Sequence, residues 1–411
     1  NQQSGFRPLH STETTLLHSV NQCLVNMDKG LINGFLFLDL KKAFDTVDHN
    51  ILISKLEKYG IRGTALRLFR SYLSERKQIC KLQNTMSEVV NLTCGVPQGS
   101  NLGPLLFLLY INDLPNCLEE TQASMFADDT NLSCQGKSSR EVESMINTDL
   151  ENVHKWLIAN KLTLNEEKTE CMLVGSRQRL QQSLNNSEIV IGNHIIQQVS
   201  SKKVLGVIID DQLKWKEHND AQCRKISQSI ALLRRAKQFV NQDTLLNMFN
   251  ALALPHFTYC SNVWSDGSCS QIEKLKKLQK RAARVITGST YEIRSTEIFE
   301  KLGWERIEII LKKREHIMTF KALCGDTPRY LSDLFVPSHN DMYQLRSNDR
   351  KLHTEKPNTN FLKKSFSYRG AVSWNNLPSE IVDVHDQLSL SSFKTLINHY
   401  YKDLEKNTST T

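Results

Sequence analysis

The chain has 411 residues, of which 39% are hydrophobic and 23% are charged. These proportions are typical of folded globular proteins and exclude a disordered chain, and the length predicts two or three domains of ordinary size. The longest apolar run, Leu102–Ile111, contains a proline and has about half the length of a membrane span, so we expect no membrane partner.

The cysteines and the opening residues set two further limits. The ten cysteines form no C-x-x-C pair and no Cys/His cluster at zinc-binding spacing, so we expect neither a disulfide framework nor a zinc site. Such cysteine usage is typical of a reducing, intracellular compartment. The chain opens on Asn1 without a secretory signal, and its first residues resemble the middle of a motif, which predicts a fragment of a longer protein.

The net charge of +8 is unevenly distributed along the chain. Residues 1–206 contain 21 Lys and Arg against 21 Asp and Glu, whereas residues 207–411 contain 31 against 23. A segregated positive excess predicts that the second half contacts a phosphate backbone. Ordinary solvated helix faces are the alternative, and the charge alone does not exclude them.

Near the start of the chain, Arg7 lies in a predicted loop before a helix that Ser11 or Thr12 can cap. A guanidinium at that place can reach a phosphate. Taken alone, Arg7 is more readily explained as a surface residue.

Residues 35–38 form a continuous apolar run of strand length, which predicts a central strand that is covered on both faces. Asp39 follows directly at its carboxyl end. A carboxylate beside so much buried surface is costly unless it is paired or binds a metal ion. Asp39 is therefore a candidate functional residue, with a structural role as the alternative.

The next two segments carry weaker signals. Residues 50–82 show helical spacing of apolar side chains, interrupted by a turn at Gly60–Gly63, and predict helices. Residues 94–115 begin with a loop rich in glycine and proline, on which Gln98 is presented, and continue as an apolar helix. The loop matches no phosphate-binding pattern, so alone it is weak evidence for a site.

Residues 125–130, MFADDT, place two adjacent aspartates directly after an apolar run. The pattern predicts a hairpin, with a strand over 124–127, a turn at Asp128–Asp129 and a return strand over 130–134. A polar turn is the alternative, because aspartate is common in turns. Carboxylates presented from a rigid sheet can also bind Mg²⁺ together with substrate phosphates.

Further along, residues 165–168 predict a turn that leads into a strand over 170–174. Another strand, over 204–209, ends in Asp210–Asp211, for which capping of the next helix is the simplest explanation. From about residue 212 the pattern is helical, and residues 271–286 form a basic amphipathic helix whose charged side can face phosphates.

Asp39, Asp128 and Asp129 all fall at the ends of predicted buried strands, which antiparallel pairing in one sheet could bring together. Carboxylates that bridge two divalent metal ions can activate a 3′-hydroxyl and stabilise a pyrophosphate leaving group. The three aspartates together are a far more specific signal for this metal-dependent chemistry than any one of them alone.

The ordered motifs GFRPLHST, FLDLKKAFDTVDH, GVPQGSNLGPLLFLLYINDL, FADD, LNEEKTE and KVLGV resemble those of the reverse transcriptases of non-LTR (LINE-type, jockey-like) retrotransposons. The later segments LPHFTYCSNVW, KLQKRAARVITG and RGAVSWNNLP are similar to the same group. The resemblance implies an α+β right-hand polymerase with an antiparallel-sheet palm, partial fingers and a helical thumb.

Residue by residue, the resemblance implies that Asp39 and Asp128 bind two Mg²⁺ ions, for which Mn²⁺ can substitute, with Asp129 as the third acidic member. Phe44 lies where the family has an aromatic ring that excludes a 2′-hydroxyl; a core phenylalanine is the alternative. Gln98 would contact the incoming nucleotide or the template.

Two further roles and the partners follow from the same resemblance. Arg7 would bind the triphosphate, and Lys168 would protonate the pyrophosphate, with an ordinary turn lysine as the alternative. The implied partners are an RNA template, a DNA primer or target, and dNTPs. The implied location is intracellular, in the nucleus or in a cytoplasmic ribonucleoprotein.

The predicted domains are fingers and palm over 1–209, a basic helical thumb over 210–335, and a C-terminal region of unassigned role over 336–411. The predicted function is RNA-directed DNA polymerase, a nucleotidyltransferase. One alternative is a catalytically silent retroelement remnant that only binds nucleic acid, and another is a group II intron or telomerase-like reverse transcriptase. The intact Asp39, Asp128 and Asp129 favour the enzyme.

Overall fold

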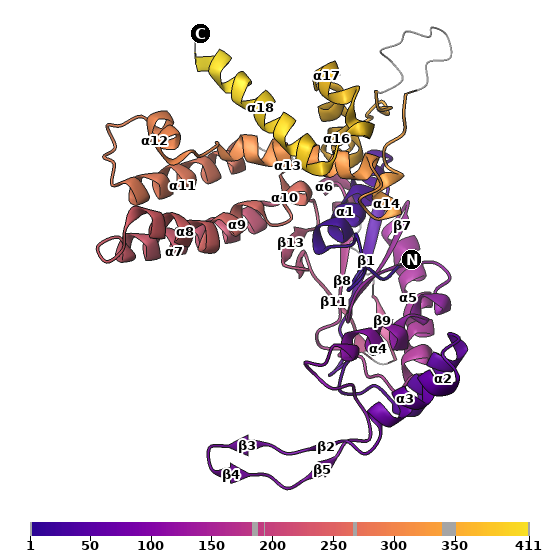
Figure 1. Ribbon diagram of the computed structural model, residues 1–411. Helices are drawn as coiled ribbons and strands as arrows, with labels where there is room; N and C mark the ends of the chain where they lie inside the picture. The colour runs from indigo at the N-terminus through magenta and orange to yellow at the C-terminus, as the bar shows by residue number, and fades with distance from the viewer. Residues whose placement is uncertain (1, 183–187, 193, 266–268, 339–350, 410–411) are drawn as a thin grey trace. The chain divides into compact units, whose positions relative to one another are not determined.

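The computed structural model describes residues 2–182, 188–192, 194–265, 269–338 and 351–409 (Figure 1). The chain divides into two compact units, one formed by Asn1–His10 and Gly30–Ser200 and the other by Ser11–Lys29 and Ser201–Thr411. Both helices and sheets are present, which confirms the predicted α+β class. No described helix is long and apolar enough to cross a membrane.

A five-stranded sheet is the centre of the first unit. Its order is β11-β8-β1-β7-β6, and all neighbouring strands are antiparallel except β11 and β8. The strands are β1 (Ile32–Leu38), β6 (Gln122–Phe126), β7 (Asp129–Gly136), β8 (Glu170–Val174) and β11 (Gln197–Gln198). The predicted apolar strand over 35–38 lies within β1, and the strand predicted over 170–174 is β8.

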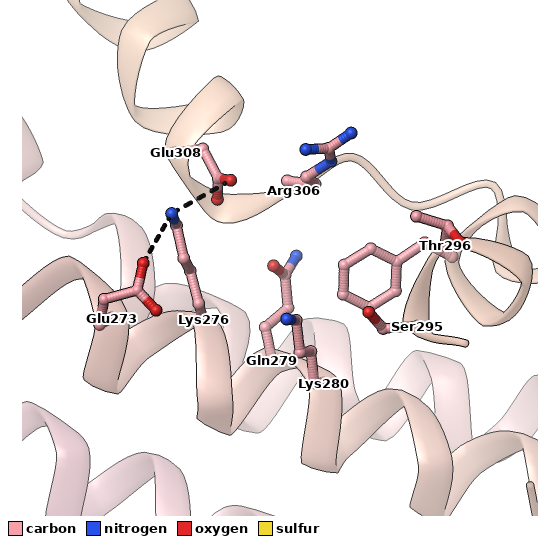
Figure 2. A pocket seen from close by; sticks show the side chains of 9 residues that line it. Glu273, Lys276, Gln279, Lys280, Ser295, Thr296, Arg306 and Glu308 are labelled. Carbon is pink, nitrogen blue, oxygen red and sulfur yellow. Dashed lines mark hydrogen bonds and ion pairs between the residues drawn. The ribbon is translucent and has the colours of Figure 1, made fainter. Parts of the chain in front are cut away.

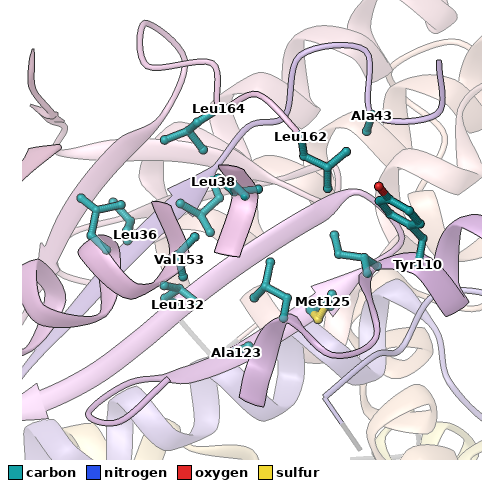
Figure 3. Close-up of a cluster of buried hydrophobic side chains, with 14 of the residues drawn as sticks. Leu36, Leu38, Ala43, Tyr110, Ala123, Met125, Leu132, Val153, Leu162 and Leu164 are labelled. Carbon is teal, nitrogen blue, oxygen red and sulfur yellow. The ribbon is translucent and has the colours of Figure 1, made fainter. Parts of the chain in front are cut away.

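Helix α5 (Ser139–Ala159) packs against β1 and β7. Its buried side chains, such as Val153, meet Leu36 and Leu132 of the sheet in one apolar cluster (Figure 3). Gly34 permits this close packing, because a Cβ atom there would lie 2.2 Å from Cγ1 of Val142. One side of the sheet is thereby covered by the apolar face of a closely packed helix.

The remaining elements of the first unit are shorter. They are α2 (His49–Lys58), α3 (Gly63–Leu73), α4 (Leu102–Ile111), η1 (Leu114–Cys117), α6 (Arg177–Gln182), β9 (Val190–Ile191) and β10 (His194–Ile195), together with an arm made of β2 (Lys77–Gln78), β3 (Lys81–Leu82), β4 (Thr85–Met86) and β5 (Val90–Asn91).

The arm corrects the helices predicted over 50–82. Helix α3 ends at Leu73, because Ser74 is extended and Glu75 has a φ of 55°, neither of which continues a helix. The chain then forms two short antiparallel ladders, β2 with β5 and β3 with β4. The side chains of these strands are exposed, so no core-facing periodicity marked them in the sequence.

The second unit is mainly helical. Besides the hairpin of β12 (Ser201–Val204) and β13 (Val207–Asp210), it contains α1 (Thr12–Asp28), α7 (Lys216–Ala236), α8 (Gln242–Leu252), α9 (Leu254–Thr258), α10 (Ser261–Trp264), α11 (Cys269–Thr287), α12 (Ser295–Leu302), α13 (Ile307–Leu323), α14 (Arg329–Ser332), α15 (Asn360–Lys364), α16 (Phe366–Asn375), α17 (Ser379–Val382), η2 (His385–Gln387) and α18 (Leu390–Ser409).

The second Asp-Asp pair has a local structural role. The carboxylate of Asp210 accepts hydrogen bonds from the backbone N–H groups of Gln212, Lys214 and Trp215 at 3.2, 2.9 and 2.7 Å. It therefore organises the turn that leads into α7. The predicted capping explanation is wrong, because the N-cap residue of α7 is Trp215 and no side-chain hydrogen bond caps the helix.

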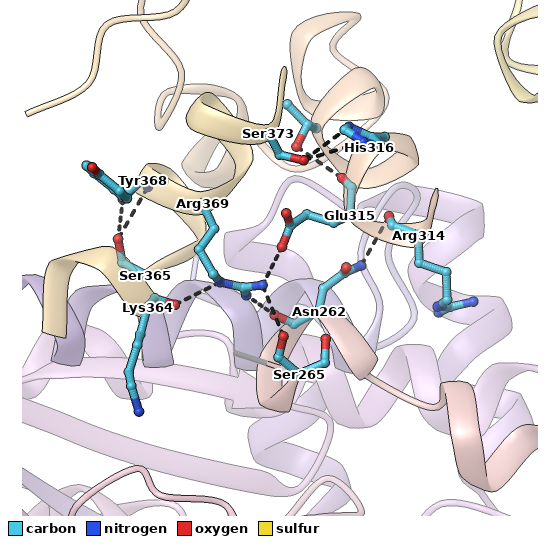
Figure 4. Close-up of polar contacts among 12 residues, drawn as sticks. Asn262, Ser265, Arg314, Glu315, His316, Lys364, Ser365, Tyr368, Arg369 and Ser373 are labelled. Carbon is cyan, nitrogen blue, oxygen red and sulfur yellow. Dashed lines mark hydrogen bonds and ion pairs between the residues drawn. The ribbon is translucent and has the colours of Figure 1, made fainter. Parts of the chain in front are cut away.

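Arg369 of α16 joins three helices of the second unit (Figure 4). Its guanidinium pairs with the carboxylate of Glu315 on α13 and donates to the backbone carbonyls of Asn262, Lys364 and Ser265. Both charged side chains are 14% exposed. The C-terminal segment is therefore packed into this unit and carries a nearly buried ion pair.

His218 makes the stability of the second unit sensitive to acid. Burial lowers its pKa to about 4, and its Nδ1 accepts a hydrogen bond from the backbone N–H of Ile208 at 3.2 Å. Between the ordinary pKa of about 6.5 and the lowered value, only the unfolded chain takes up a proton, so stability falls as the pH falls through this window.

We therefore predict that His218→Gln makes the fall in unfolding free energy between pH 6.5 and pH 4 shallower than in the wild type, as measured by urea denaturation. The control is His399→Gln, which changes an exposed ring on α18. Equal slopes for His218→Gln and the wild type would contradict the prediction.

Candidate active site

Asp39 follows the last residue of β1 and is half-buried. Leu38 pairs with Thr130 of β7, so the antiparallel register brings Asp39 next to the start of β7, where Asp129 lies. The carboxyl end of one strand and the amino end of its antiparallel neighbour lie at the same end of the sheet, and so do their side chains. The structure thus gathers the predicted aspartates at one end of the central sheet.

Asp39 is held by the segment that precedes β8. Asn165 donates from Nδ2 to Oδ2 of Asp39 at 2.7 Å and from its backbone N–H to the carbonyl of Asp39 at 2.7 Å. The backbone N–H of Asp39 donates to Oγ1 of Thr169 at 3.3 Å. The sequence reasoning did not single out Asn165; its only signal was its place in the motif LNEEKTE.

The aspartate hairpin is shifted by one residue from the prediction. Phe126 pairs with Asp129, so the turn consists of Ala127 and Asp128, not Asp128 and Asp129. The register follows burial, because Met125 and Thr130 are both about 1% exposed and lie opposite each other. Ala127 has a φ of 57°, as the first residue of a tight two-residue hairpin turn requires.

The side chains of Asp39, Asp128 and Asp129 at this end of the sheet suit a hard divalent cation, because they offer carboxylate oxygens as ligands. Asp128 and Asp129 are exposed. Among the residues that the structure describes, no three His, Cys, Asp or Glu side chains lie close enough to hold a metal ion. Mg²⁺ takes only one or two protein carboxylates and completes its shell with water and substrate phosphates, so Asp39 and Asp128 fit it without a closed cage.

Phe44 and Gln98 lie on two segments that are bonded to each other. The Phe44 carbonyl accepts from the Val96 N–H at 2.9 Å, and Gln98 donates from Nε2 to Oδ1 of Asp45 at 3.0 Å. Gly95 permits this approach, because its φ is 86° and a Cβ atom would lie 2.8 Å from the Asp45 carbonyl oxygen. The structure therefore brings these two predicted residues together.

The Phe44 ring also packs on a helix. Its centroid lies 4.4 Å from that of Phe107 on α4, with 28° between the ring planes. The ring is half-buried, so one part supports the core and the other remains accessible. A structural and a substrate-facing role are compatible at this position.

The two remaining predicted residues also belong to the first unit. Lys168 is exposed in the turn that holds Asp39, and its backbone N–H donates to the Asn165 carbonyl at 3.1 Å. Arg7 is half-buried, and its guanidinium donates to the Gln3 carbonyl at 3.0 Å.

A pocket in the second unit contains none of these residues. It has a volume of about 250 Å³ and is lined by residues of α11, α12 and α13 (Figure 2). Lys276 lies between Glu273 and Glu308, at 2.9 and 3.4 Å, and Arg306 pairs with Glu405 at 3.2 Å. Two of the three cations that line the pocket, Lys276 and Arg306, are thus paired with carboxylates of the protein, and Lys280 is the third.

The carboxylates at one end of the sheet, and the loop that carries Gln98, are consistent with the family to which the chain is matched. Residues 1–209 match the family described as reverse transcriptase (RNA-dependent DNA polymerase), and the chain belongs to this family. This match, together with the mobile-element relatives described next, supports the predicted resemblance to non-LTR retrotransposon enzymes, and members of the family generally depend on divalent metal ions.

The curated relatives come from mobile elements. The chain is 27% identical over 308 residues to "Probable RNA-directed DNA polymerase from transposon X-element" of Drosophila melanogaster, covering 73% of this chain and 33% of the relative. It is 24% identical over 330 residues to "RNA-directed DNA polymerase from mobile element jockey" of Drosophila funebris, covering 77% and 35%. The chain thus spans about a third of the length of these relatives.

A solved structure, "Structure of apo telomerase from Candida Tropicalis", has 12% sequence identity and a TM-score of 0.37, covering 80% of this chain and 52% of that chain. This likeness is too distant to carry an argument about the site.

Proposed function

We propose that the chain is an RNA-directed DNA polymerase of a non-LTR retrotransposon, which adds dNTPs to a primer 3′-hydroxyl on an RNA template. The observation that carries the proposal is that Asp39 and the turn with Asp128 lie at the same end of the sheet. The chain that contains them belongs to the reverse transcriptase family. A primer–template duplex and a triphosphate are the substrates that such a site can use.

The proposed cofactor is a pair of Mg²⁺ ions, with Mn²⁺ as a substitute. When bound, such ions activate the attacking hydroxyl and stabilise the pyrophosphate leaving group. Asp39 and Asp128 would hold them through carboxylate oxygens, and Asp129 would be the third acidic member. The hydrogen bond from Asn165 to Oδ2 orients the Asp39 carboxylate.

The other residues bind and position the substrates. Arg7 would contact the triphosphate, Lys168 would donate a proton to the departing pyrophosphate, and Gln98 would lie against the nascent base pair. The basic helices α7 and α11 would hold the duplex by its phosphates, without reading its sequence. A nuclear or ribonucleoprotein location is part of the same proposal.

The proposal is tested by primer extension with the purified chain on an RNA template, with Mg²⁺ and dNTPs. The expected result is DNA synthesis that stops when the metal is chelated. Retarded migration of the primer–template without any incorporation would instead support the nucleic-acid-binding remnant.

Phe44 provides a specific prediction about nucleotide choice. We expect Phe44→Val to raise the incorporation of ribonucleotides relative to deoxynucleotides by about a hundredfold, because the smaller side chain no longer collides with a 2′-hydroxyl. The measurement is the ratio of kcat/KM for a dNTP and the matching rNTP. Phe44→Tyr keeps the ring and should preserve the wild-type ratio, and an unchanged ratio in Phe44→Val would remove Phe44 from this role.

A further inference from the structure

The segment before α1 runs alongside the aspartate hairpin. The backbone N–H of Ser4 donates to the Met125 carbonyl at 2.8 Å, and that of Met125 donates to the Gln2 carbonyl at 2.9 Å. Gln3 and Met125 thereby form a parallel bridge at the edge of β6. This pairing places Gln3, which is 7% exposed, beside the end of the strand that leads to Asp128.

The Gln3 side chain contacts both backbone polar groups of Ala127. Its Oε1 accepts from the N–H groups of Ala127 and Gly5 at 3.0 and 2.7 Å, and its Nε2 donates to the Ala127 carbonyl at 3.5 Å. Because two N–H donors face the same atom, that atom must be the amide oxygen, which fixes the orientation of the side chain.

Ala127 needs such support. Its φ of 57° lies in the left-handed region, where the Cβ atom of an L-residue is close to the following carbonyl. An alanine left without support would favour other conformations, and Asp128, the next residue, would move with it. The position of the Asp128 carboxylate thus depends on what holds Ala127.

Gly5 and Arg7 complete this arrangement. A Cβ atom at Gly5 would lie 2.5 Å from the Ala127 nitrogen, so only glycine lets the segment approach the turn this closely. Arg7 donates to the Gln3 carbonyl at 3.0 Å. The side chain proposed to bind the triphosphate therefore contacts the same residue that holds the aspartate turn.

We propose that Gln3 is a positioning residue for the catalytic turn. Its amide holds Ala127 in the left-handed conformation and so fixes the place of the Asp128 carboxylate. Gln3 acts through Ala127 and not by touching the substrate. The inference rests on the proposed function, in which Asp128 is a metal ligand.

The first test is Gln3→Met in the full chain, which keeps the length of the side chain and removes its hydrogen bonds. Displacing a metal ligand should lower kcat for primer extension about ten- to a hundredfold. Hydrogen exchange of the Ala127 amide should become faster, since its acceptor is lost. Gln2→Met is the control, because Gln2 is exposed and pairs with Met125 only through its backbone carbonyl; it should leave both readouts unchanged.

The second test distinguishes positioning from general stabilisation. Glycine adopts positive φ as readily as negative φ, so Ala127→Gly should restore most of the lost kcat in the Gln3→Met background. A purely structural role of Gln3 would give no such rescue.

The proposal is overturned if Gln3→Met leaves kcat and Ala127 exchange at wild-type values, or if Ala127→Gly fails to restore kcat. A wild-type chain without polymerase activity would defeat the proposed function. In that case faster exchange of the Ala127 amide in Gln3→Met would still support the hydrogen-bonded clamp, and unchanged exchange would refute it.

Discussion

Replacing Asp128 by asparagine should reduce RNA-templated primer extension by about a thousandfold, because a neutral amide contributes far less than a carboxylate to holding a divalent cation, and several kcal/mol of transition-state stabilisation are lost. Asp128 is exposed in its turn, so the fold should survive the change. The measurement is single-nucleotide incorporation at saturating dNTP, with the melting temperature as a check of folding.

The matched control for this prediction is Asp211→Asn. Asp211 is the second member of the other Asp-Asp pair. It directly follows β13 in the second unit and is half-buried. The same chemical change there should leave extension at the wild-type rate. Equal activity of Asp128→Asn and the wild type would show that the carboxylate of Asp128 does not bind the metal.

The second large effect is expected on stability. Arg369→Met should lower the unfolding free energy of the second unit by about 3–5 kcal/mol, because it leaves the Glu315 carboxylate and three backbone carbonyls without their donor in a nearly buried site. The measurement is chemical denaturation, followed by a probe in this unit such as the fluorescence of buried Trp264 and Trp374.

The control for the second prediction is Arg329→Met. Arg329 pairs with Asp333 at 3.5 Å, but the two side chains are 91% and 65% exposed. An exposed pair of this kind contributes at most about 1 kcal/mol. If Arg369→Met costs no more than Arg329→Met, the ion pair on α16 is not a determinant of the fold.

The parts of the site that the sequence predicted are those with strong local signals. The second half of β1 follows from the apolar run over 35–38, whose length favours a strand covered on both faces, and Asp39 stands out because it ends that run. The hairpin that carries Asp128 follows from two strand-like runs around a short polar turn. Its register required knowledge of burial, since the choice between turns at 127–128 and 128–129 depends on which faces Met125 and Thr130 present.

The parts that local patterns missed depend on contacts between distant residues. Asn165 lies 126 residues from Asp39, and Gln3 lies 124 residues from Ala127. Amide side chains are common on surfaces, so nothing in their own neighbourhoods marks them as supports of the site. Exposed strands such as β3 and β4 were not predicted either. They bury neither face, so their sequences show no alternation of apolar and polar residues.

Contacts between distant residues also decide the division into units, which the sequence did not predict fully. The sequence pattern places a boundary near residue 209, whereas α1 packs with α15 and α10 in the second unit. The Asp28 carboxylate at the end of α1 accepts from the N–H groups of Asn358 and Thr359, at 3.2 and 2.7 Å. A helix near the start of the chain is thus fixed by residues near its end. The thumb assigned to residues 210–335 stays a prediction.

The most direct test of the central claim is a crystal structure of the full chain with an RNA template, a DNA primer that lacks its 3′-hydroxyl, a dNTP and Mg²⁺. The account predicts metal ions about 2.0–2.1 Å from carboxylate oxygens of both Asp39 and Asp128, with the triphosphate bound beside them. Metal ions bound elsewhere, or Asp39 and Asp128 too far apart to share them, would contradict it.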